Sequence, residues 1–237
     1  MQDGEDGTLE AREGQSRGVH PRDPQATRRR ILEAALTAFA AEGLDGARID
    51  RIARAAEANV QMIYRYFGDK EGLYRAALEE TYGRIRILER QLDLGTLPPQ
   101  DGIRLLIEFT FDYLCDNPDF VSIIRGENMS GGRFVRQLAM VPDTTQPLVE
   151  ALAGIVLRGQ ASGVFTAEVD TTQLYVTILS LCMTHLSQRA TLSAMFQRDL
   201  GNREWLAARR AHVVDVVLAF LTIARPAAVG MSPNDGT

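Results

Sequence analysis

The side chains best suited to binding chemistry lie between Arg48 and Lys70, in a short segment dense in aromatic residues. Arginine and lysine can pair with phosphates, glutamine can hydrogen-bond an adenine edge, and a tyrosine hydroxyl can donate to a phosphate oxygen. Aliphatic side chains can contact the methyl group of thymine. At helical spacing, these residue types predict contact with double-stranded DNA. The residues expected to make this contact are Arg48, Asn59, Val60, Gln61, Met62, Tyr64, Arg65, Tyr66 and Lys70.

Two short helices joined by a few residues would position this set. The segment Ile49–Ala58 carries an apolar stripe and is predicted to form the first of them. Asn59 is a good N-cap for the second, in which Ile63 and Phe67 are one turn apart and suit the buried side. The opposite side then remains for base edges and phosphates. This spacing predicts a helix-turn-helix unit over about residues 48–67.

Amphipathic helices are expected on both sides of this unit. Asp23 can cap a helix whose apolar residues recur with helical period and which Gly43 would end. A further helix is expected to begin at Asp69. Lys70 would then lie in its first turn, where unpaired backbone N–H groups and the helix dipole also attract a phosphate.

The remainder of the chain also shows helical periods. A strongly apolar helix is expected from Thr171 to about Ser187, and a last helix from Arg203 to about Ala224. No convincing alternating run supports a strand, so the predicted fold class is all-α. Turn residues that would separate the helices stand at 116–118, at 130–132, at Pro142 and at 159–163.

The composition divides the chain into four parts. Residues 1–23 are predicted to be a disordered tail, 24–84 a DNA-binding domain, 85–225 a helical body, and 226–237 a flexible tail. No apolar run approaches the roughly 20 residues of a membrane span, and no secretory signal is expected. With only two cysteines, far apart in sequence, a reducing cytoplasm fits best.

Charge is informative through its distribution rather than its sum. The formal net charge of −5 does not by itself indicate a nucleic-acid binder. Basic residues cluster locally, however, at 28–30 and again between Arg48 and Lys70, and local clustering is what phosphate contact requires. Taken singly, the tyrosines are more often core residues and an arginine run a solvated face. Their joint occurrence within fifty residues favours DNA.

The same segments resemble the N-terminal signature of TetR/AcrR-type transcriptional regulators. The similar blocks are ILEAALTAFAAEG at 31–43, Ile-Ala at 52–53, IYRYF at 63–67 and DKEGL at 69–73. The resemblance implies a three-helix DNA-binding head, a helical ligand-sensing body, and a homodimer on a palindromic DNA operator. A small-molecule effector in the body would favour a different separation of the two heads and so release the operator.

By motif position, the resemblance implies that Tyr64 and Lys70 contact phosphates and that Val60–Met62 face bases. Three departures from the family pattern lie close by. Arg48 stands where such regulators usually carry threonine or serine, Glu57 stands where glycine is usual, and Gln61 stands where a small residue is common after the third helix begins. A positive φ at Glu57 would cost about 1 kcal/mol relative to glycine.

The body is expected to hold an apolar ligand pocket with a few polar handles. Each aromatic residue in it could equally be plain core. The residues considered for the pocket are Phe109, Phe111, Tyr113, Phe120, Phe134, Tyr175, Met183, His185 and Phe196.

The last two long helices are the expected dimer surface, giving a four-helix interface between two subunits. Such a dimer would hold its two reading helices about one DNA turn apart, roughly 34–36 Å. The predicted interface residues are Leu174, Leu181, Val213, Val216, Val217, Phe220 and Leu221.

Other chemistries are less well supported. Cys182 with His185, and His212 with Asp215, have the helical i, i+3 spacing of metal ligands, but such pairs arise often by chance. No phosphate-binding loop, dinucleotide fingerprint, zinc-protease motif or nucleophile elbow is present, so neither catalysis nor a cofactor is expected. A DNA-binding regulator controlled by protein partners, without a small-molecule effector, remains the alternative.

Overall fold

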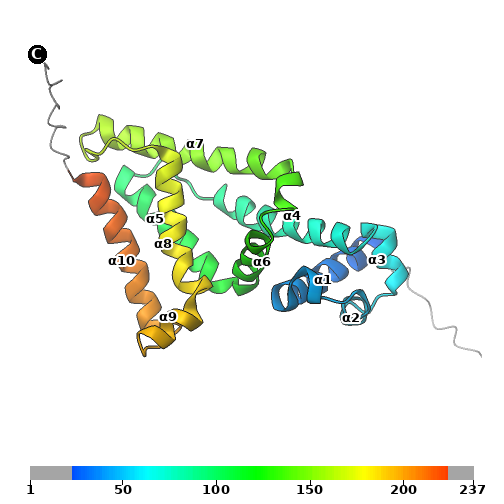
Figure 1. Cartoon of the computed structure of the whole chain (residues 1–237). Coiled ribbons are helices and arrows are strands. Elements are labelled where there is room, and N and C mark those ends of the chain that lie inside the picture. The colour runs from blue at the N-terminus through cyan, green and yellow to red at the C-terminus, as the bar shows by residue number, and fades with distance from the viewer. Residues whose placement is uncertain (1–22, 224–237) are drawn as a thin grey trace, which may run out of the picture.

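The computed structural model describes residues 23–223, and within them every regular element is a helix (Figure 1). The predicted all-α class is therefore confirmed for this part of the chain. Of the predicted tails, 1–23 and 226–237, all but Asp23 lie outside the described residues, and Asp23 is the N-cap of the first helix. The elements in chain order are α1 (Pro24–Gly46), α2 (Ile49–Ala55), α3 (Val60–Phe67), α4 (Lys70–Glu89), α5 (Pro99–Asp116), α6 (Pro118–Met129), the 3-10 turn η1 (Val135–Gln137), α7 (Met140–Ala161), α8 (Thr171–Ser187), α9 (Arg189–Met195) and α10 (Arg203–Thr222).

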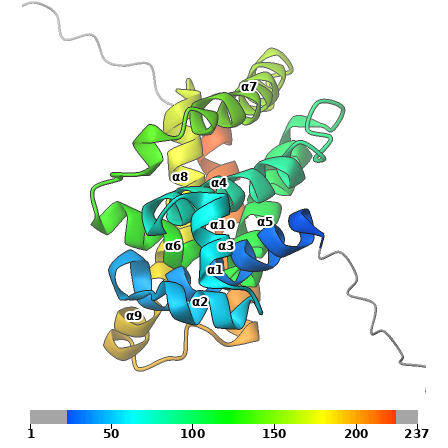
Figure 2. The ribbon, with the colours of Figure 1, turned by 90° about the vertical axis from the view of Figure 1, so that its right-hand side faces the viewer.

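The helices form two parts, which we call the head and the body. The head consists of α1, α2, α3 and the N-terminal half of α4, and the body consists of α5 to α10 (Figure 1). Figure 2 views the molecule from the head side, so that α1, α2 and α3 come forward. The head has its own core, in which Ile31, Phe39, Ile52, Ile63 and Leu73 are almost completely buried.

The head helices begin where the sequence predicts. The Asp23 carboxylate accepts a hydrogen bond from the Gln25 N–H at 2.9 Å, and Asp69 caps α4 in the same way through the Gly72 N–H. The predicted helix end at Gly43 is confirmed: its φ of 70° and ψ of 177° are not helical and interrupt the regular helix that begins at Pro24. Glycine tolerates this conformation, and the short helical segment that follows, to Gly46, is separated from the rest of α1 by a kink.

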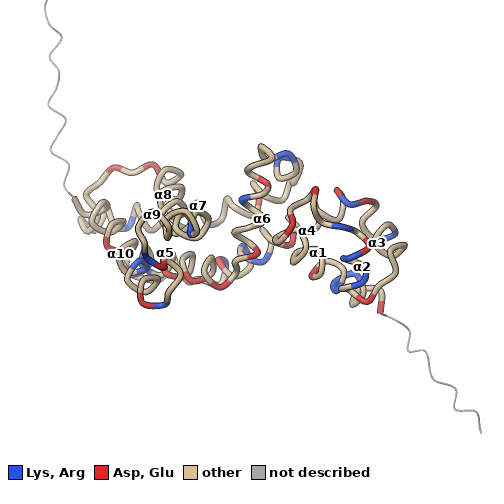
Figure 3. Tube along the Cα trace, turned by 60° about the horizontal axis from the view of Figure 1, so that its bottom comes forward, with Lys and Arg blue, Asp and Glu red and all other residues tan. Residues whose placement is uncertain are grey.

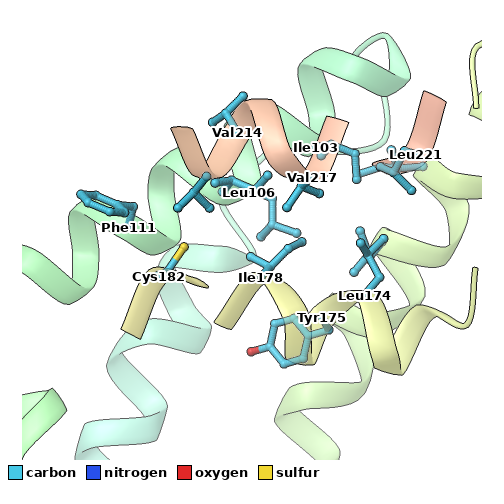
Figure 4. Packing of buried hydrophobic residues seen from close by; sticks show 14 of the residues in the cluster. Ile103, Leu106, Phe111, Leu174, Tyr175, Ile178, Cys182, Val214, Val217 and Leu221 are labelled. Carbon is cyan, nitrogen blue, oxygen red and sulfur yellow. The ribbon is translucent and has the colours of Figure 1, made fainter. Parts of the chain in front are cut away.

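Four long helices enclose the core of the body. Helix α5 packs against α7, α8 and α10, and the side chains that meet between them are aliphatic or aromatic (Figure 4). Ile103 and Leu106 of α5 face Ile178 of α8 and Val217 of α10 in this cluster. Burial of such side chains is the main favourable contribution to the stability of the body.

One predicted break is wrong. Pro142 does not interrupt the chain but lies in the first turn of α7, where the backbone N–H groups have no intrahelical acceptor, so proline loses nothing there. Pro147 also lies inside this helix. The other predicted breaks coincide with helix ends at 116–118 and 130–132. The predicted break at 159–163 contains the end of α7 at Ala161, although Gly159 is still helical.

Helix α4 belongs to both parts of the molecule. Its N-terminal half contributes Leu73 and Leu78 to the head core, whereas its C-terminal half packs against α7 of the body. A second link is α6, which packs against α1 on one side and α8 on the other. The head therefore cannot move relative to the body without a change in the contacts of α4 or α6.

A buried ion pair fixes the body end of α4. The Arg86 guanidinium donates to the carboxylate of Glu89 and, over 3.1 Å, to the hydroxyl of Tyr175 on α8. Arg86 and Glu89 are only 7% and 4% exposed. Burial raises the pKa of Glu89 in spite of the neighbouring guanidinium, because a buried carboxylate loses its hydration.

We predict that removing one partner of this pair is costly and that removing the whole group is not. Glu89→Ala should lower the free energy of unfolding by about 3–5 kcal/mol, because it leaves a buried charge uncompensated. The triple variant Arg86→Met/Glu89→Leu/Tyr175→Phe should recover most of that loss. Urea unfolding followed by circular dichroism measures both.

The control is Arg84→Ala/Glu80→Ala, which removes a solvent-exposed pair from the same helix and should change stability by at most about 0.5 kcal/mol. Equal losses in Glu89→Ala and the triple variant would contradict the assignment, because they would locate the effect in packing and not in the unpaired charge.

Candidate DNA-binding interface

Helices α2 and α3 form a compact helix-turn-helix. The Ala58 N–H donates to the carbonyl of Ala53 at 2.9 Å and closes the turn, and the Asn59 side chain caps α3 by accepting from the Gln61 N–H at 2.8 Å. The predicted positive φ at Glu57 is confirmed, with a value of 49°. A non-glycine residue thus adopts the left-handed conformation that this turn requires.

Helix α3 presents one face to the solvent and one to the head core. Ile63 is completely buried and anchors the helix, as the spacing predicts, whereas Gln61, Tyr64 and Arg65 are exposed. Tyr64 is 52% exposed, which is unusual for a large aromatic side chain in a folded head. These three residues form the free face that a recognition helix needs in order to enter a DNA groove.

The other predicted contact residues of α3 are less free. Val60, Met62 and Tyr66 are half-buried and pack against the head core. The ring of Tyr66 also lies edge-on to that of Phe67, with centroids 6.3 Å apart. These residues therefore support the position of α3, and a contact with bases or phosphates would have to use the edges that they leave exposed.

Basic residues flank the free face of α3. Arg48 precedes α2 and its Nε lies 3.2 Å from the carboxylate of Asp50, in an exposed pair that contributes little to stability. Lys70 opens α4 and donates from Nζ to the carbonyl oxygen of Asp45 at 3.1 Å. Both cations stand at the N-terminus of a helix, where a phosphate oxygen would also meet free N–H groups.

The close approach of α3 and α4 requires a glycine. A Cβ atom on Gly72 would lie 2.0 Å from the carbonyl oxygen of Phe67, closer than any real contact. Gly72 therefore allows α4 to begin directly after α3, which holds Lys70 beside the exposed residues of α3. In the segment 69–73, Gly72 is therefore required by the packing of α4 against α3, whereas Lys70 is available for binding.

The arginine cluster at 28–30 has structural partners. Arg28 lies over the ring of Phe67, 5.0 Å from its centroid, and Arg30 donates to the carbonyl of Ala56 at 3.2 Å, at the end of α2. These contacts, which the sequence pattern did not reveal, join α1 to both helices of the unit. Figure 3 shows the basic residues around α1, α2 and α3 interleaved with acidic ones.

An exposed recognition helix, a capped turn before it and cations at neighbouring helix ends define a helix-turn-helix DNA-binding protein. Comparison with known families agrees. Residues 31–77 match the model of bacterial regulatory proteins of the tetR family, and residues 99–217 match a tetracyclin repressor-like C-terminal domain. The chain belongs to the TetR family of transcriptional regulators.

Characterised relatives are repressors. The chain is 35% identical over 201 residues to the HTH-type transcriptional repressor NicS of Pseudomonas putida, covering 85% of this chain and 95% of that protein. It is 34% identical over 162 residues to the repressor SCO4008 of Streptomyces coelicolor, covering 68% and 78%. The protein is therefore a DNA-binding transcriptional regulator.

Solved structures share the fold. The putative transcriptional regulator SCO4942 from Streptomyces coelicolor superimposes with a TM-score of 0.61 and 27% identity, over 81% of this chain and 96% of that one. FadR from Bacillus subtilis, solved in complex with stearoyl-CoA, gives a TM-score of 0.63 at 18% identity, over 81% and 98%, which shows the fold alone. In the part of the chain described by the structure, no helix is long and apolar enough to cross a membrane.

The residues predicted for a single ligand pocket are distributed over several places. Phe109 and Tyr113 stack at 6.0 Å and line a cavity of about 720 Å³ between α4 and α5. Tyr113 also lies edge-on to Phe120, and this pair lines a smaller cavity of about 300 Å³ between body and head. His185 and Phe196 line a third cavity, of about 520 Å³, next to α9.

Four of the predicted pocket residues line none of these cavities. Phe134 is a correction: it belongs to the head core, where its ring lies edge-on to Tyr74 at 5.2 Å. Tyr175 is tied to the buried Arg86, Phe111 lies in the body core, and Met183 packs against that core. Sequence spacing along one helix could not distinguish these environments, because each depends on which other helix lies opposite.

The predicted dimer surface also needs correction. Leu174, Val213, Val217 and Leu221 are at most 1% exposed and form part of the body core, so these four cannot meet a second subunit. The reason is that α8 and α10 each pack one apolar side inward. Of the remaining predicted residues, Leu181 is half-buried, and Val216 and Phe220 are each 39% exposed.

No metal centre forms around the two pairs with ligand spacing. Within residues 23–223, no group of three or more histidine, cysteine or acidic side chains could hold a metal ion. Burial raises the pKa of the Cys182 thiol to about 12, which disfavours the thiolate that metals bind. His212 and Asp215 lie on the exposed side of α10.

His185 is instead a buried neutral histidine. It is 3% exposed, and its ring stacks on Phe111 at a centroid distance of 5.0 Å. Burial, together with the positive charge of Arg209, lowers its pKa from 6.5 to about 4. The nearby carbonyl oxygen of Leu181 favours the protonated ring and so raises the pKa slightly. This oxygen already accepts a hydrogen bond from Arg209, so its effect on His185 is small.

We predict that Tyr64 contributes to DNA binding and not to folding. Tyr64→Ala should weaken binding by about fivefold to tenfold, because a hydrogen bond and contact area are lost, while the melting temperature stays unchanged. Fluorescence anisotropy on DNA that the wild-type protein selects from a random library measures the affinity. Tyr113→Phe, in the body, is the control, and wild-type affinity in Tyr64→Ala would remove α3 from the interface.

We predict that His185 makes the fold acid-sensitive. Its folded pKa lies below its unfolded value, so the unfolded chain binds the extra proton, and stability is complete above pH 6.5 and falls toward pH 4. Over this window the wild type should lose about 3 kcal/mol more than His185→Gln in urea unfolding. His212→Gln, at an exposed histidine, should behave as the wild type. Parallel pH curves for wild type and His185→Gln would disprove the assignment.

Proposed function

We propose that this regulator is a ligand-responsive repressor that binds a palindromic operator as a homodimer and releases it when a small molecule binds the body. The observation that carries the proposal is the exposed face of α3, with Gln61, Tyr64 and Arg65 free and cations beside it. Glutamine and arginine can read base edges in the major groove, and the tyrosine hydroxyl can reach a phosphate. The protein would act at the chromosome, in the bacterial cytoplasm.

Dimerisation is supported by apolar side chains on the outer sides of α8 and α10. On α8, Val176 is 51% exposed. On α10, Val216 and Phe220 are exposed, and Ile223, directly after this helix, is 59% exposed. Exposed apolar residues gathered on two neighbouring helices indicate a surface that a partner covers. A two-fold axis would then pair α8 and α10 with the same helices of a second copy.

Ligand control is supported by the cavities and by the links between the two parts. The body cavities of about 720 and 520 Å³ have the size of small-molecule sites. A protein of the same fold, FadR, holds stearoyl-CoA. Because α4 packs in the head and in the body, a ligand that favours one position of its C-terminal half would alter the head position and with it the operator affinity.

The test is selection of bound DNA from a random library with the purified full-length protein at a stated salt concentration. We expect a palindromic consensus whose half-sites are about one helical turn apart, roughly 34–36 Å. Tyr64→Ala, carried through the same selection, should give weaker enrichment. A consensus without two-fold symmetry would contradict the dimer, and no enrichment by folded protein would contradict sequence-specific reading.

A further inference from the structure

A cavity of about 520 Å³ opens between α8, α9 and α10, away from the head. Its wall is mostly apolar or aromatic, and the charged side chains that line it within residues 23–223 are all basic. The chain from α9 to α10 borders it and turns at Gln197, a non-glycine residue with a φ of 49°. The lining residues that matter here are His185, Leu192, Phe196, Arg198, Trp205 and Arg209.

The two arginines of this cavity lack counter-ions. Arg209 is half-buried, and its Nη2 donates to the carbonyl oxygen of Leu181 at 3.1 Å, but its Nε is buried without a partner. Within residues 23–223 neither Arg209 nor Arg198 lies in an ion pair. A partly desolvated guanidinium without an anion is unfavourable. The nearby Arg210 shows the usual solution, since it pairs with Asp112 at 2.8 Å.

The aromatic side of the cavity is well defined. His185 lies between Phe111 and Trp205, with ring centroids 5.0 and 5.4 Å away. Among the residues that the structure describes, neither ring nitrogen of His185 has a hydrogen-bond partner, although the side chain is almost fully buried. Phe196, on the outer side of the cavity, is 64% exposed, which leaves a large apolar ring without cover.

We propose that this cavity binds a small organic anion with a flat apolar body, such as an aromatic carboxylate. The carboxylate would pair with Arg198 and Arg209, and the ring would lie against Trp205 and Phe196. This ligand supplies the negative charge that the wall lacks and covers the apolar surface that the fold leaves open. The inference deepens the proposed function and rests on it, because it assigns a ligand class to one of the body cavities that support ligand control.

The chain provides its own reporter for the test. Trp205 is the single tryptophan of the sequence and lines the cavity, so tryptophan fluorescence of the full-length protein reports on this site alone. We expect benzoate to change the emission saturably. Benzamide, its uncharged analogue of the same shape, should bind at least about tenfold more weakly, because it cannot form the charged pair.

Two variants separate binding from folding. Arg209→Gln and Arg198→Gln should each weaken benzoate binding by about tenfold, and Arg198 is exposed, so its replacement leaves the fold intact. Arg203→Gln, at an exposed arginine of α10 outside the cavity, is the matched control and should bind as the wild type. Equal affinity for benzoate and benzamide, an unsaturable response, or binding unchanged in both cavity variants would overturn the proposal. Since no DNA is present, failure of this test would leave operator binding, which the DNA selection measures, unaffected, so the two failures are distinguishable.

Discussion

The guanidinium of Arg86 is buried at the C-terminal end of α4, and Glu89 and Tyr175 fix its position. The rest of the architecture depends on this contact, because α4 is the helix that the head and body share. A buried charge tolerates only the geometry that keeps it paired, unlike an aliphatic contact, which can slide. The pair thus joins the C-terminal end of α4 to α8 through Tyr175, and α4 connects this point to the head.

The head is joined to the body at a second place with a different character. Glu127 of α6 is buried and accepts hydrogen bonds from the backbone N–H groups of Phe134 and Val135, at 2.6 and 2.9 Å. Phe134 then reaches Tyr74 of α4, so a body loop is built into the head core. These two links lie toward opposite ends of α4, so a change in head position under the proposed two-state function would have to alter at least one of them.

Charge is handled differently at Arg86, Arg210 and Arg209, three of the buried or half-buried arginines of the described residues. Arg86 has an internal carboxylate, Arg210 has two carboxylates on α5, and Arg209 has only a backbone carbonyl. The charges of Arg86 and Arg210 are therefore neutralised within one subunit. The third stands beside a cavity and an uncovered Phe196, and this contrast within one fold is the physical basis for assigning an anionic ligand to that site.

Local sequence determined the helices of the head, their caps and which side of α3 is exposed. Asp23, Asn59 and Asp69 cap where their side chains can reach the next N–H groups, and Glu57 takes the strained φ, because these interactions span only a few residues. Only the tertiary structure decided which side of each body helix faces inward. The sequence shows that Val213 and Phe134 are both apolar, but Val213 packs in the body core and Phe134 in the head core. The sequence could not predict this difference, because helical periodicity shows which side of a helix is apolar and not which other helix that side packs against.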